Sequence, residues 1–254
     1  MALSDDQIIA VRPTKKIYRD GDTVLKVFAP DYPKANILNE ALNQARVEET
    51  DLHIPRILEV FKTDGCWAIR MEYIEGKTLQ QLMEEKPDKH DEYLKQFVAL
   101  QMEVHKRRAP LLTMLRDKMH RKISASSDNF EATVRFELHQ RLEGMPKHVK
   151  LCHGDFNPSN IIITADGTPF IIDWSHATQG NASADVARTY LWLTLNSGED
   201  AAKEYLKAFC KMSDTAIQYV QNWMPIVAAS QSVKENSKEE LALLSRWVNV
   251  VDYV

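Results

Sequence analysis

The sequence has little cysteine, no excess of basic residues and no long apolar run, and each shortage excludes a class of protein. The three cysteines, Cys66, Cys152 and Cys210, form no C-x-x-C pair, which excludes a disulfide framework and indicates reduced thiols. A net charge of -4 provides no basic field for phosphate backbones, so no nucleic-acid partner is expected. No stretch approaches the roughly 18 apolar residues of a membrane helix, so no membrane partner is expected either.

The N-terminus also lacks the features of a signal peptide. It carries Asp5 and Asp6 where a signal peptide has basic residues before a longer apolar run, which favours a cytoplasmic protein. The 254 residues, 44% of them hydrophobic, suffice for one large domain or two small lobes. At this size roughly 75% of the unfolded chain's surface can be buried, so a sizeable core is expected.

The first part of the chain has the pattern of a small sheet around one helix. Runs of β-branched and aromatic residues, bounded by Asp-Gly turns, predict strands at 23–28, 57–63 and 66–71. Residues 35–49 have apolar side chains at helical spacing, which predicts one helix between the first two of these strands.

Beyond Thr78 the pattern changes to long amphipathic segments, and the remainder is predicted to be mostly helical. The expected helices are 88–105, 110–122, 129–142 and much of the chain after Asp185; short strands are expected at 150–152, 161–164 and 169–172. The sequence therefore predicts an α+β fold with an N-terminal lobe, 1–71, a connection at 72–76 and a C-terminal lobe, 77–254.

The most informative segment is 153–160, followed by two apolar runs and Asp173. If Asp166-Gly167 is a two-residue hairpin turn, Asn160 lies directly across the ladder from Asp173, with Cβ atoms roughly 4.5–5.5 Å apart. An amide oxygen and a carboxylate at that separation can share a hard cation such as Mg²⁺. Asp155, in the loop before Asn160, can then accept a proton from an attacking hydroxyl.

A simpler interpretation competes with this one, because Asp, Asn, Pro and Ser also make ordinary turns. It is the better interpretation for Asp155 or Asn160 taken alone, but it gives no reason for the joint spacing with Asp173. His153 has no second His or Cys at ligand spacing, which favours a hydrogen-bonding role over a metal-binding one.

Two residues of the N-terminal lobe suggest a nucleotide phosphate as the electrophile. Lys26 interrupts an apolar strand, where an ammonium group is costly unless it is paired or at an edge. Glu40 lies on the predicted helix beside its apolar stripe and could be the partner, although a solvated helix face would also explain it. As a pair they fit an ammonium held over the α and β phosphates.

These residues resemble the aminoglycoside phosphotransferase and choline kinase superfamily, which shares the two-lobed protein kinase fold. The family motif H-G-D-x-x-x-x-N falls on 153–160, and the motif I-D-W falls on 172–174. The resemblance implies a bilobal protein-kinase-like fold, with Asp155 as the catalytic base, Asn160 as a metal ligand and Asp173 as the main Mg²⁺ ligand.

The resemblance also implies roles for residues outside these motifs. Lys26 and Glu40 match the phosphate-binding lysine and its helix glutamate, and 71–76 resembles the interlobe hinge. There the Glu72 carbonyl and the Ile74 amide would bind adenine. Two further matches are structural: His105, on the helix before the catalytic loop, and Asp185, which supports that loop. The implied activity is transfer of the γ-phosphate of ATP, with Mg²⁺, to a hydroxyl of a small-molecule acceptor.

The sequence departs from the family pattern at three places. The turn that should cover the phosphates, 12–16, has no glycine, and Ser175 and Asn181 stand where many members have acidic residues. Residues 107–150 contain 10 Lys plus Arg against 5 Asp plus Glu, which counts against a polycationic acceptor unless it is only a solvated face.

Two other functions compete with this one. A nucleotide-binding pseudokinase, a regulatory module without turnover, is supported by the glycine-free turn. A protein-substrate kinase is disfavoured because no long activation segment is recognisable between Asp173 and Asp185.

Overall fold

The chain divides by its internal contacts into two units, each built from two separate stretches of sequence. The first unit comprises residues 1–87 and 158–176, and the second comprises 88–157 and 177–254. The structure, a computed structural model, describes residues 4–249. These units differ from the lobes predicted at 1–71 and 77–254, because a strand just after residue 76 pairs with the hairpin that follows residue 160.

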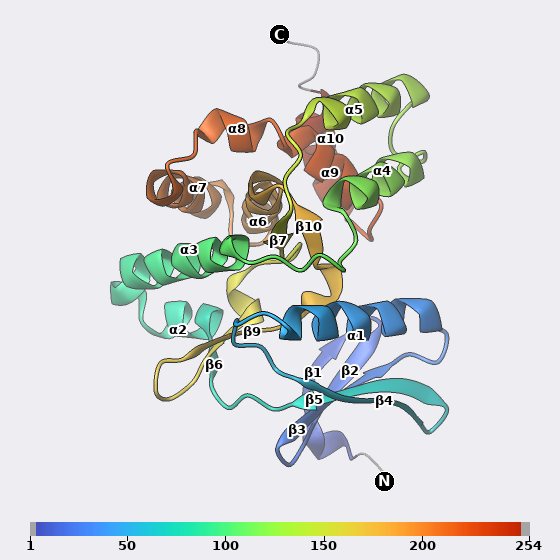
Figure 1. Cartoon of the computed structure of the whole chain (residues 1–254), viewed down its shortest axis with the longest axis vertical. Helices are drawn as coiled ribbons and strands as arrows, with labels where there is room; N and C mark the ends of the chain where they lie inside the picture. The colour runs from blue at the N-terminus through green and yellow to red at the C-terminus, as the bar shows by residue number, and fades with distance from the viewer. Residues whose placement is uncertain (1–3, 250–254) are drawn as a thin grey trace. The chain divides into compact units, whose positions relative to one another are not determined.

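A five-stranded antiparallel sheet forms most of the first unit (Figure 1). Its strands are β1 (Ile8–Arg12), β2 (Lys15–Asp20), β3 (Thr23–Phe28), β4 (Ile57–Thr63) and β5 (Cys66–Glu72), in the order β1-β2-β3-β5-β4. The Asp-Gly turn between β4 and β5 is confirmed: Asp64 and Gly65 have φ of 48° and 80°, the left-handed values of a type I′ hairpin. Strands β1 and β2 were not predicted.

Helix α1 (Lys34–Glu48) packs on this sheet and closes its core. Pro33, with its fixed φ, precedes the first turn. The buried apolar residues that meet between helix and sheet are Phe28, Ile37, Ala41, Ile69 and Met71. Because α1 is amphipathic, the side chains flanking its apolar stripe are brought to the edge of the sheet core.

A second, three-stranded sheet completes the first unit, in the order β6-β8-β9. The strands of this sheet are β6 (Lys77–Thr78), β8 (Ile161–Ile163) and β9 (Pro169–Ile171). Helix α2 (Leu79–Glu85) follows β6, and two 3-10 helices, Pro158–Asn160 and Trp174–His176, flank the β8–β9 hairpin. The predicted register of the β8–β9 hairpin is wrong by one residue. Ile161 pairs with Ile171, so Asn160 lies opposite Ile172 and not opposite Asp173.

The turn chemistry of this hairpin explains the error. The connection is not a two-residue Asp-Gly turn but a longer one, closed by a bond from the Thr164 amide to the Thr168 carbonyl. The Thr164 hydroxyl accepts a further bond, of 3.1 Å, from the Thr168 amide. Side-chain bonds of this kind stabilise alternative turns that a Gly signal alone does not reveal.

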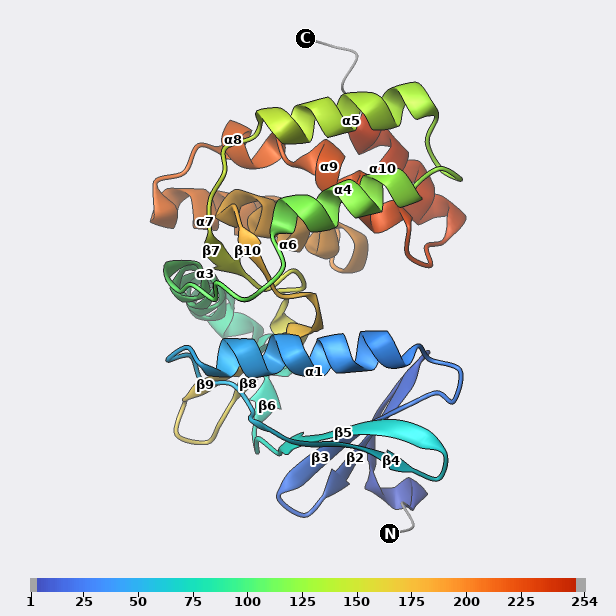
Figure 2. The same cartoon turned by 45° about the vertical axis from the view of Figure 1, so that its right-hand side comes forward.

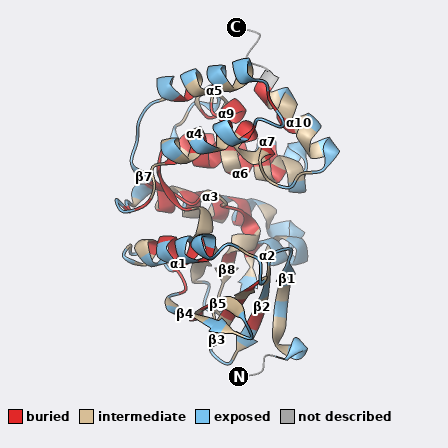
Figure 3. Ribbon diagram, turned by 90° about the vertical axis from the view of Figure 1, so that its right-hand side faces the viewer, coloured by how far each residue is buried: buried red, intermediate tan, exposed pale blue. Residues whose placement is uncertain are grey.

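The second unit is mostly helical, as predicted (Figure 2). Its helices are α3 (His90–Lys106), α4 (Leu115–Ala125), α5 (Ala132–Gly144), α6 (Ala182–Asn196), α7 (Glu199–Ser213), α8 (Ile217–Gln221), α9 (Met224–Ser232) and α10 (Lys238–Asn249). A two-stranded sheet pairs β7 (Lys150–Cys152) with β10 (Thr178–Gly180). Helix α6 is buried along most of its length and packs against α7 and α9 (Figure 3). Within residues 4–249, none of the helices has the length and apolar character needed to cross a membrane.

Candidate active site

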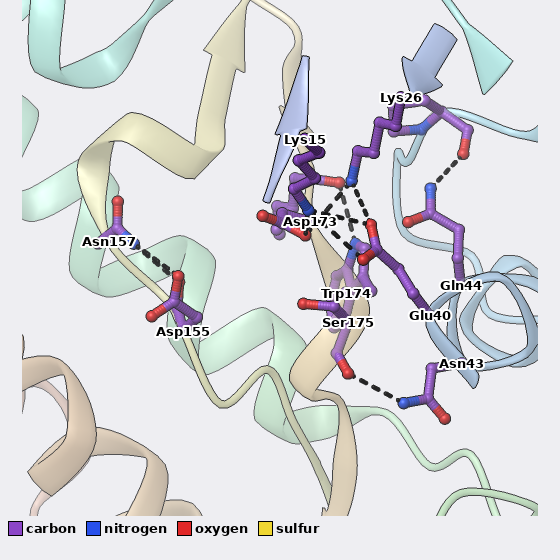
Figure 4. A network of polar contacts seen from close by, with 12 residues as sticks. Lys15, Lys26, Glu40, Asn43, Gln44, Asp155, Asn157, Asp173, Trp174 and Ser175 are labelled. Atoms are coloured by element: carbon purple, nitrogen blue, oxygen red, sulfur yellow. Dashed lines mark hydrogen bonds and ion pairs between the residues drawn. The ribbon is translucent and has the colours of Figure 1, made fainter. Parts of the chain in front are cut away.

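A buried lysine and two carboxylates meet in the first unit (Figure 4). The Lys26 Nζ lies 2.8 Å from the Glu40 Oε1 and 3.3 Å from the Asp173 Oδ1. Lys26 comes from β3, Glu40 from α1, and Asp173 follows β9, so residues far apart in the sequence are brought together. The Lys26–Glu40 pair suggested by the sequence is present as a direct ion pair.

Burial and charge act in opposite directions on Lys26. The side chain is almost enclosed, with 8% of the residue exposed, and Glu40 is equally buried. Burial by itself lowers the pKa of Lys26, but the charges of Asp173 and Glu40 outweigh it and raise the pKa above its ordinary value. The ammonium is therefore held charged in a site that excludes most water.

Lys15 is a second cation of this cluster, and the sequence did not reveal it as a partner. Its Nζ lies 3.3 Å from the Glu40 Oε1 and 3.9 Å from the Asp173 Oδ1. Lys15 pairs with Phe28 across the β2–β3 ladder, and Lys26 is two residues away on the same strand as Phe28. Residues paired across a ladder and residues two apart on one strand point to the same face of a sheet, so Lys15 and Lys26 share a face. The register of the β2–β3 hairpin is the signal that could have identified Lys15 as a partner.

Helix α1 is fastened near Glu40 by side chains from its next turn. The Asn43 Nδ2 donates to the Ser175 carbonyl at 3.2 Å, and the Gln44 Nε2 donates to the Pro55 carbonyl at 2.6 Å. Both side chains are buried. Glu40 and the segment after Asp173 are thus linked through the helix as well as through Lys26.

The backbone of Asp173 is strained. Its φ of 63° is left-handed, a conformation that costs a non-glycine residue roughly 1–3 kcal/mol and persists where surrounding contacts fix it. Those contacts come from both neighbours. The Ile172 amide donates to the Asn160 carbonyl at 2.9 Å, and the buried indole Nε1 of Trp174 donates to the Ile171 carbonyl at 3.0 Å.

The residues at this end of the hairpin fit a hard divalent cation. Asn160 ends the 3-10 helix before β8 and Asp173 follows β9, so an amide oxygen and a carboxylate belong to the same end of the hairpin. The Asp173 side chain keeps 30% of its surface exposed. Oxygen donors in small number suit Mg²⁺, which keeps most of its water and phosphate ligands. Across residues 4–249, no group of three or more His, Cys, Asp or Glu side chains could hold a metal.

Asp155 belongs to the second unit, in the loop after β7. Its Oδ2 accepts from the Asn157 Nδ2 at 3.4 Å, and that amide also donates to the Asp155 carbonyl at 3.0 Å (Figure 4). The Asp155 amide donates to the Nδ1 of the buried His153 at 3.2 Å, which is the hydrogen-bonding role expected for that histidine. The carboxylate is thereby oriented by its own loop.

Asp185 fixes the beginning of this loop by accepting hydrogen bonds from its backbone. Its two carboxylate oxygens accept the backbone amides of His153 at 3.2 Å and Gly154 at 2.7 Å. The His105 Nε2 lies 3.0 Å from the same carboxylate. Burial alone raises the pKa of Asp185, but the bond from His105 and the surrounding donors outweigh it and lower the pKa. Both matches suggested by resemblance, His105 and Asp185, thus contact the loop or its support.

Arg188, one turn after Asp185 on α6, also contacts the loop and was not predicted. Its Nη2 lies 3.8 Å from the Asp155 Oδ1, and its Nε donates to the Gly154 carbonyl at 3.4 Å. Helical spacing from Asp185 was the available signal, because residues three apart share a helix face.

The proposed adenine-binding residues lie at the end of β5 and just beyond it. Glu72 ends β5 and its side chain pairs with Arg56 at 2.6 Å, whereas Ile74 is in the segment between β5 and β6. The connection between β1 and β2 consists of Pro13 and Thr14, so it has no glycine. Asn181 is buried, and its side chain accepts from the Ser183 amide at 2.9 Å to cap α6.

Comparison with known proteins decides the family. The sequence profile described as the phosphotransferase enzyme family matches residues 14–220, more than half of the chain. The chain belongs to this family. Comparison of the sequence with curated proteins gives no match.

Solved structures with the same fold cover almost all of the chain. The apo form of a thermostable mutant of aminoglycoside phosphotransferase APH(4)-Ia aligns with a TM-score of 0.69 and 16% identity, over 96% of this chain and 92% of that one. Choline kinase LicA from Streptococcus pneumoniae aligns with a TM-score of 0.64 and 13% identity, over 96% and 92%. The phosphotransferase thus has the α+β kinase-like fold that the resemblance implied.

Proposed function

We propose that this phosphotransferase transfers the γ-phosphoryl group of ATP to a hydroxyl of a small molecule, with Mg²⁺ as its metal. The observation that carries the proposal is the buried cluster of Lys26, Glu40 and Asp173. An ammonium fixed by a helix carboxylate suits the α and β phosphates, and the adjoining carboxylate suits a metal ion. A ternary complex of APH(4)-Ia with AMP-PNP and hygromycin B, of the same fold, supports a nucleotide and a small-molecule acceptor.

Asp155 is proposed as the base of the reaction. The acceptor oxygen attacks the γ-phosphorus, the bond from that phosphorus to the bridging oxygen of ADP breaks, and the hydroxyl proton passes to the Asp155 carboxylate. Asn157 and Arg188 contact that carboxylate, and the bond from the Asp155 amide to His153 holds its backbone, so orientation is supplied by the fold.

Lys26 would contact the α and β phosphates, and the Glu72 carbonyl and Ile74 amide would bind adenine. Asp173 and Asn160 would hold the metal. When bound, Mg²⁺ would supply positive charge that offsets the negative charge of the transferred phosphoryl group.

A nucleotide-binding regulatory module without turnover is the second candidate, favoured by the glycine-free connection between β1 and β2. A screen distinguishes the two. Release of ADP is measured with Mg-ATP and a panel of amino alcohols, sugars, aminoglycosides and nucleosides, and phosphorylated products are identified by ³¹P NMR. ADP release that requires an acceptor supports the enzyme, and tight Mg-ATP binding without any product supports the regulatory module.

Asp155→Asn then tests the base. The amide keeps the shape of the side chain but cannot take the proton, so turnover should fall about 10²- to 10⁴-fold while ATP affinity stays near that of the wild type. Asp200→Asn, a change of the same charge at an exposed position of α7, is the control and should leave both unchanged. Wild-type turnover in Asp155→Asn would remove Asp155 from the role of base.

A further inference from the structure

The connection between β1 and β2 has few of the groups that let a backbone hold a phosphate chain. It consists of Pro13 and Thr14, so one of its two residues has no amide hydrogen and neither is glycine. Glycine lets a backbone approach a phosphate closely enough for amide hydrogens to donate to it. A nucleotide bound by the first unit therefore depends more on side chains for its phosphate contacts.

Lys15, the first residue of β2, directly follows this connection and is held in place. It pairs with Phe28 across the ladder, and the carbonyl of the preceding Thr14 accepts the Ala29 amide at 2.9 Å. The Lys15 Nζ lies 5.7 Å from the centre of the Phe28 ring, within range of a cation–π contact. Only 15% of the Lys15 side chain is exposed, whereas the next residue, Lys16, is exposed. Lys15 is thus a largely enclosed cation and not a surface lysine of the sheet.

Lys15 and Lys26 share one carboxylate, but not equally (Figure 4). The Lys26 Nζ lies 2.8 Å from the Glu40 Oε1. The Lys15 Nζ lies 3.3 Å from the same oxygen and 3.4 Å from the Glu40 Oε2. Bonds from a charged nitrogen to a carboxylate are ordinarily about 2.7–2.9 Å long. Lys26 therefore makes the strong contact with Glu40, and Lys15 makes two weaker ones that are easier to exchange.

The second carboxylate near Lys15 is the proposed metal ligand. The Lys15 Nζ lies 3.9 Å from the Asp173 Oδ1, at the outer limit of an ion pair. When Asp173 holds a metal, the remaining three charges of the cluster are the ammonium groups of Lys15 and Lys26 and the carboxylate of Glu40. Two positive charges against one negative charge attract an anion, and the phosphate chain of a nucleotide is strongly anionic.

We infer that Lys15 binds the phosphate chain of the nucleotide directly, as a second ammonium beside Lys26, and supplies contacts that the glycine-free connection does not. The inference rests on the proposed function and deepens it at the nucleotide site. Lys15 exchanges its long contacts with Glu40 for a phosphate oxygen while Lys26 keeps its short one, so Glu40 stays paired. A bond from an ammonium to a phosphate is charge-assisted and therefore stronger than one from a neutral amide.

The test measures nucleotide binding without an acceptor. Dissociation constants for Mg-ATP and for adenosine are determined by calorimetry with the wild type and with Lys15→Met. Loss of one charge-assisted bond should weaken Mg-ATP binding roughly 10- to 100-fold. Adenosine has no phosphate and should bind to Lys15→Met as it does to the wild type. Lys62→Met, at an exposed lysine of β4 in the same sheet, is the matched control and should change neither constant.

The outcomes separate this inference from the proposed function. Equal Mg-ATP affinity of the wild type and Lys15→Met would overturn the inference, because no contact would then have been lost. Equal losses with Mg-ATP and adenosine would also overturn it, because they would indicate a general disturbance of the site. If the loss is confined to Mg-ATP but no alcohol is phosphorylated in the screen, the transferase proposal fails and the Lys15 contact stands. A wild type that does not bind Mg-ATP would overturn both.

Discussion

Lys26 is a cation inside a sheet, and two carboxylates keep it there. A buried ammonium is costly unless it is paired, and removing one partner of a buried pair leaves an uncompensated charge. Here Glu40 and Asp173 both form ion pairs with Lys26, and Lys15 pairs with Glu40 beside them. Glu40 is fixed by its helix whereas Asp173 is proposed to bind metal, so Glu40 is the partner expected to remain on Lys26 when nucleotide enters.

This gives a prediction for a double-mutant cycle on kcat/KM. Lys26→Met and Glu40→Gln should each lower catalytic efficiency strongly, and the double variant should lose little more than either one, because both changes disable one unit. Lys26→Met combined with Glu49→Gln, at the exposed end of α1, is the control and should be additive. Melting temperatures show that each variant is folded. Full additivity for Lys26 and Glu40 would mean that the two act independently.

Lys118 gives a prediction about pH and stability. Burial and the nearby cations lower its pKa to about 7 in the folded chain, against 10.5 for an ordinary lysine. Between these values the unfolded chain binds more protons, so stability rises with pH; the cost of Lys118 is full below about pH 7 and disappears towards 10.5. Lys118→Met should therefore stabilise the protein more at about pH 6 than at about pH 9, measured by urea unfolding in chloride buffer. For the control, Arg121→Met, the change should be the same at both values; the same pH-independence in Lys118→Met would contradict the prediction.

At the scale of elements, strong local patterns predicted where several strands and helices lie. The bounds of some elements differ from the prediction because contacts with distant residues determine where they begin. Strands 23–28 and 57–63 were predicted at their observed bounds, because a glycine-containing turn precedes the first β-branched run and Asp64-Gly65 follows the second. The helix predicted from residue 110 begins at Leu115 instead. The reason is Gln179, which holds the preceding segment by donating to the Pro110 and Leu112 carbonyls at 2.8 and 2.7 Å.

Strands β1 and β2 were missed for a different reason. Four of the six side chains of Lys15–Asp20 are charged, whereas Ile8–Arg12 has apolar side chains at its exposed positions too, so neither segment alternates clearly between apolar and polar residues. Pairing with β3 supplies the order that local sequence does not. The one-residue error in the β8–β9 register also comes from structure that the local sequence does not specify, because the register of a hairpin depends on the turn that joins its strands.

Gly76 is the element-scale position where a small change should be costly. A Cβ at this residue would overlap the Ile163 carbonyl oxygen and the Ile162 side chain, which belong to the strand that pairs with β6. Gly76→Ala should therefore lower the free energy of unfolding by roughly 1–3 kcal/mol, measured by urea denaturation. Gly144→Ala, at the end of α5 with open space around it, is the control and should change stability by less than about 1 kcal/mol. Equal stability of the two variants would contradict the close approach of β6 and β8.

At the scale of the whole molecule, the motif residues could be named from sequence but their surroundings could not. Lys26, Asp155 and Asp173 were identified by residue type and spacing. Lys15 and Arg188 were not, because each acquires its contact from a different element.

The nucleotide gives the last prediction, which concerns the stability of the whole chain. A ligand that binds only the folded state stabilises it, by about 2.7 kcal/mol at a concentration of 100 times its Kd. For a chain of this size, that corresponds to a rise in melting temperature of roughly 5–10 °C.

ATP with Mg²⁺ should produce such a rise in the wild type and in Asp155→Asn, because Asp155 is proposed to act on the acceptor. Asp173→Asn should lose most of it, since the amide is a weaker partner for the metal. Chelation of the metal with EDTA should reduce the wild-type rise to that of Asp173→Asn. A full rise in Asp173→Asn, or one that survives EDTA, would show that nucleotide binding does not depend on a metal held by Asp173.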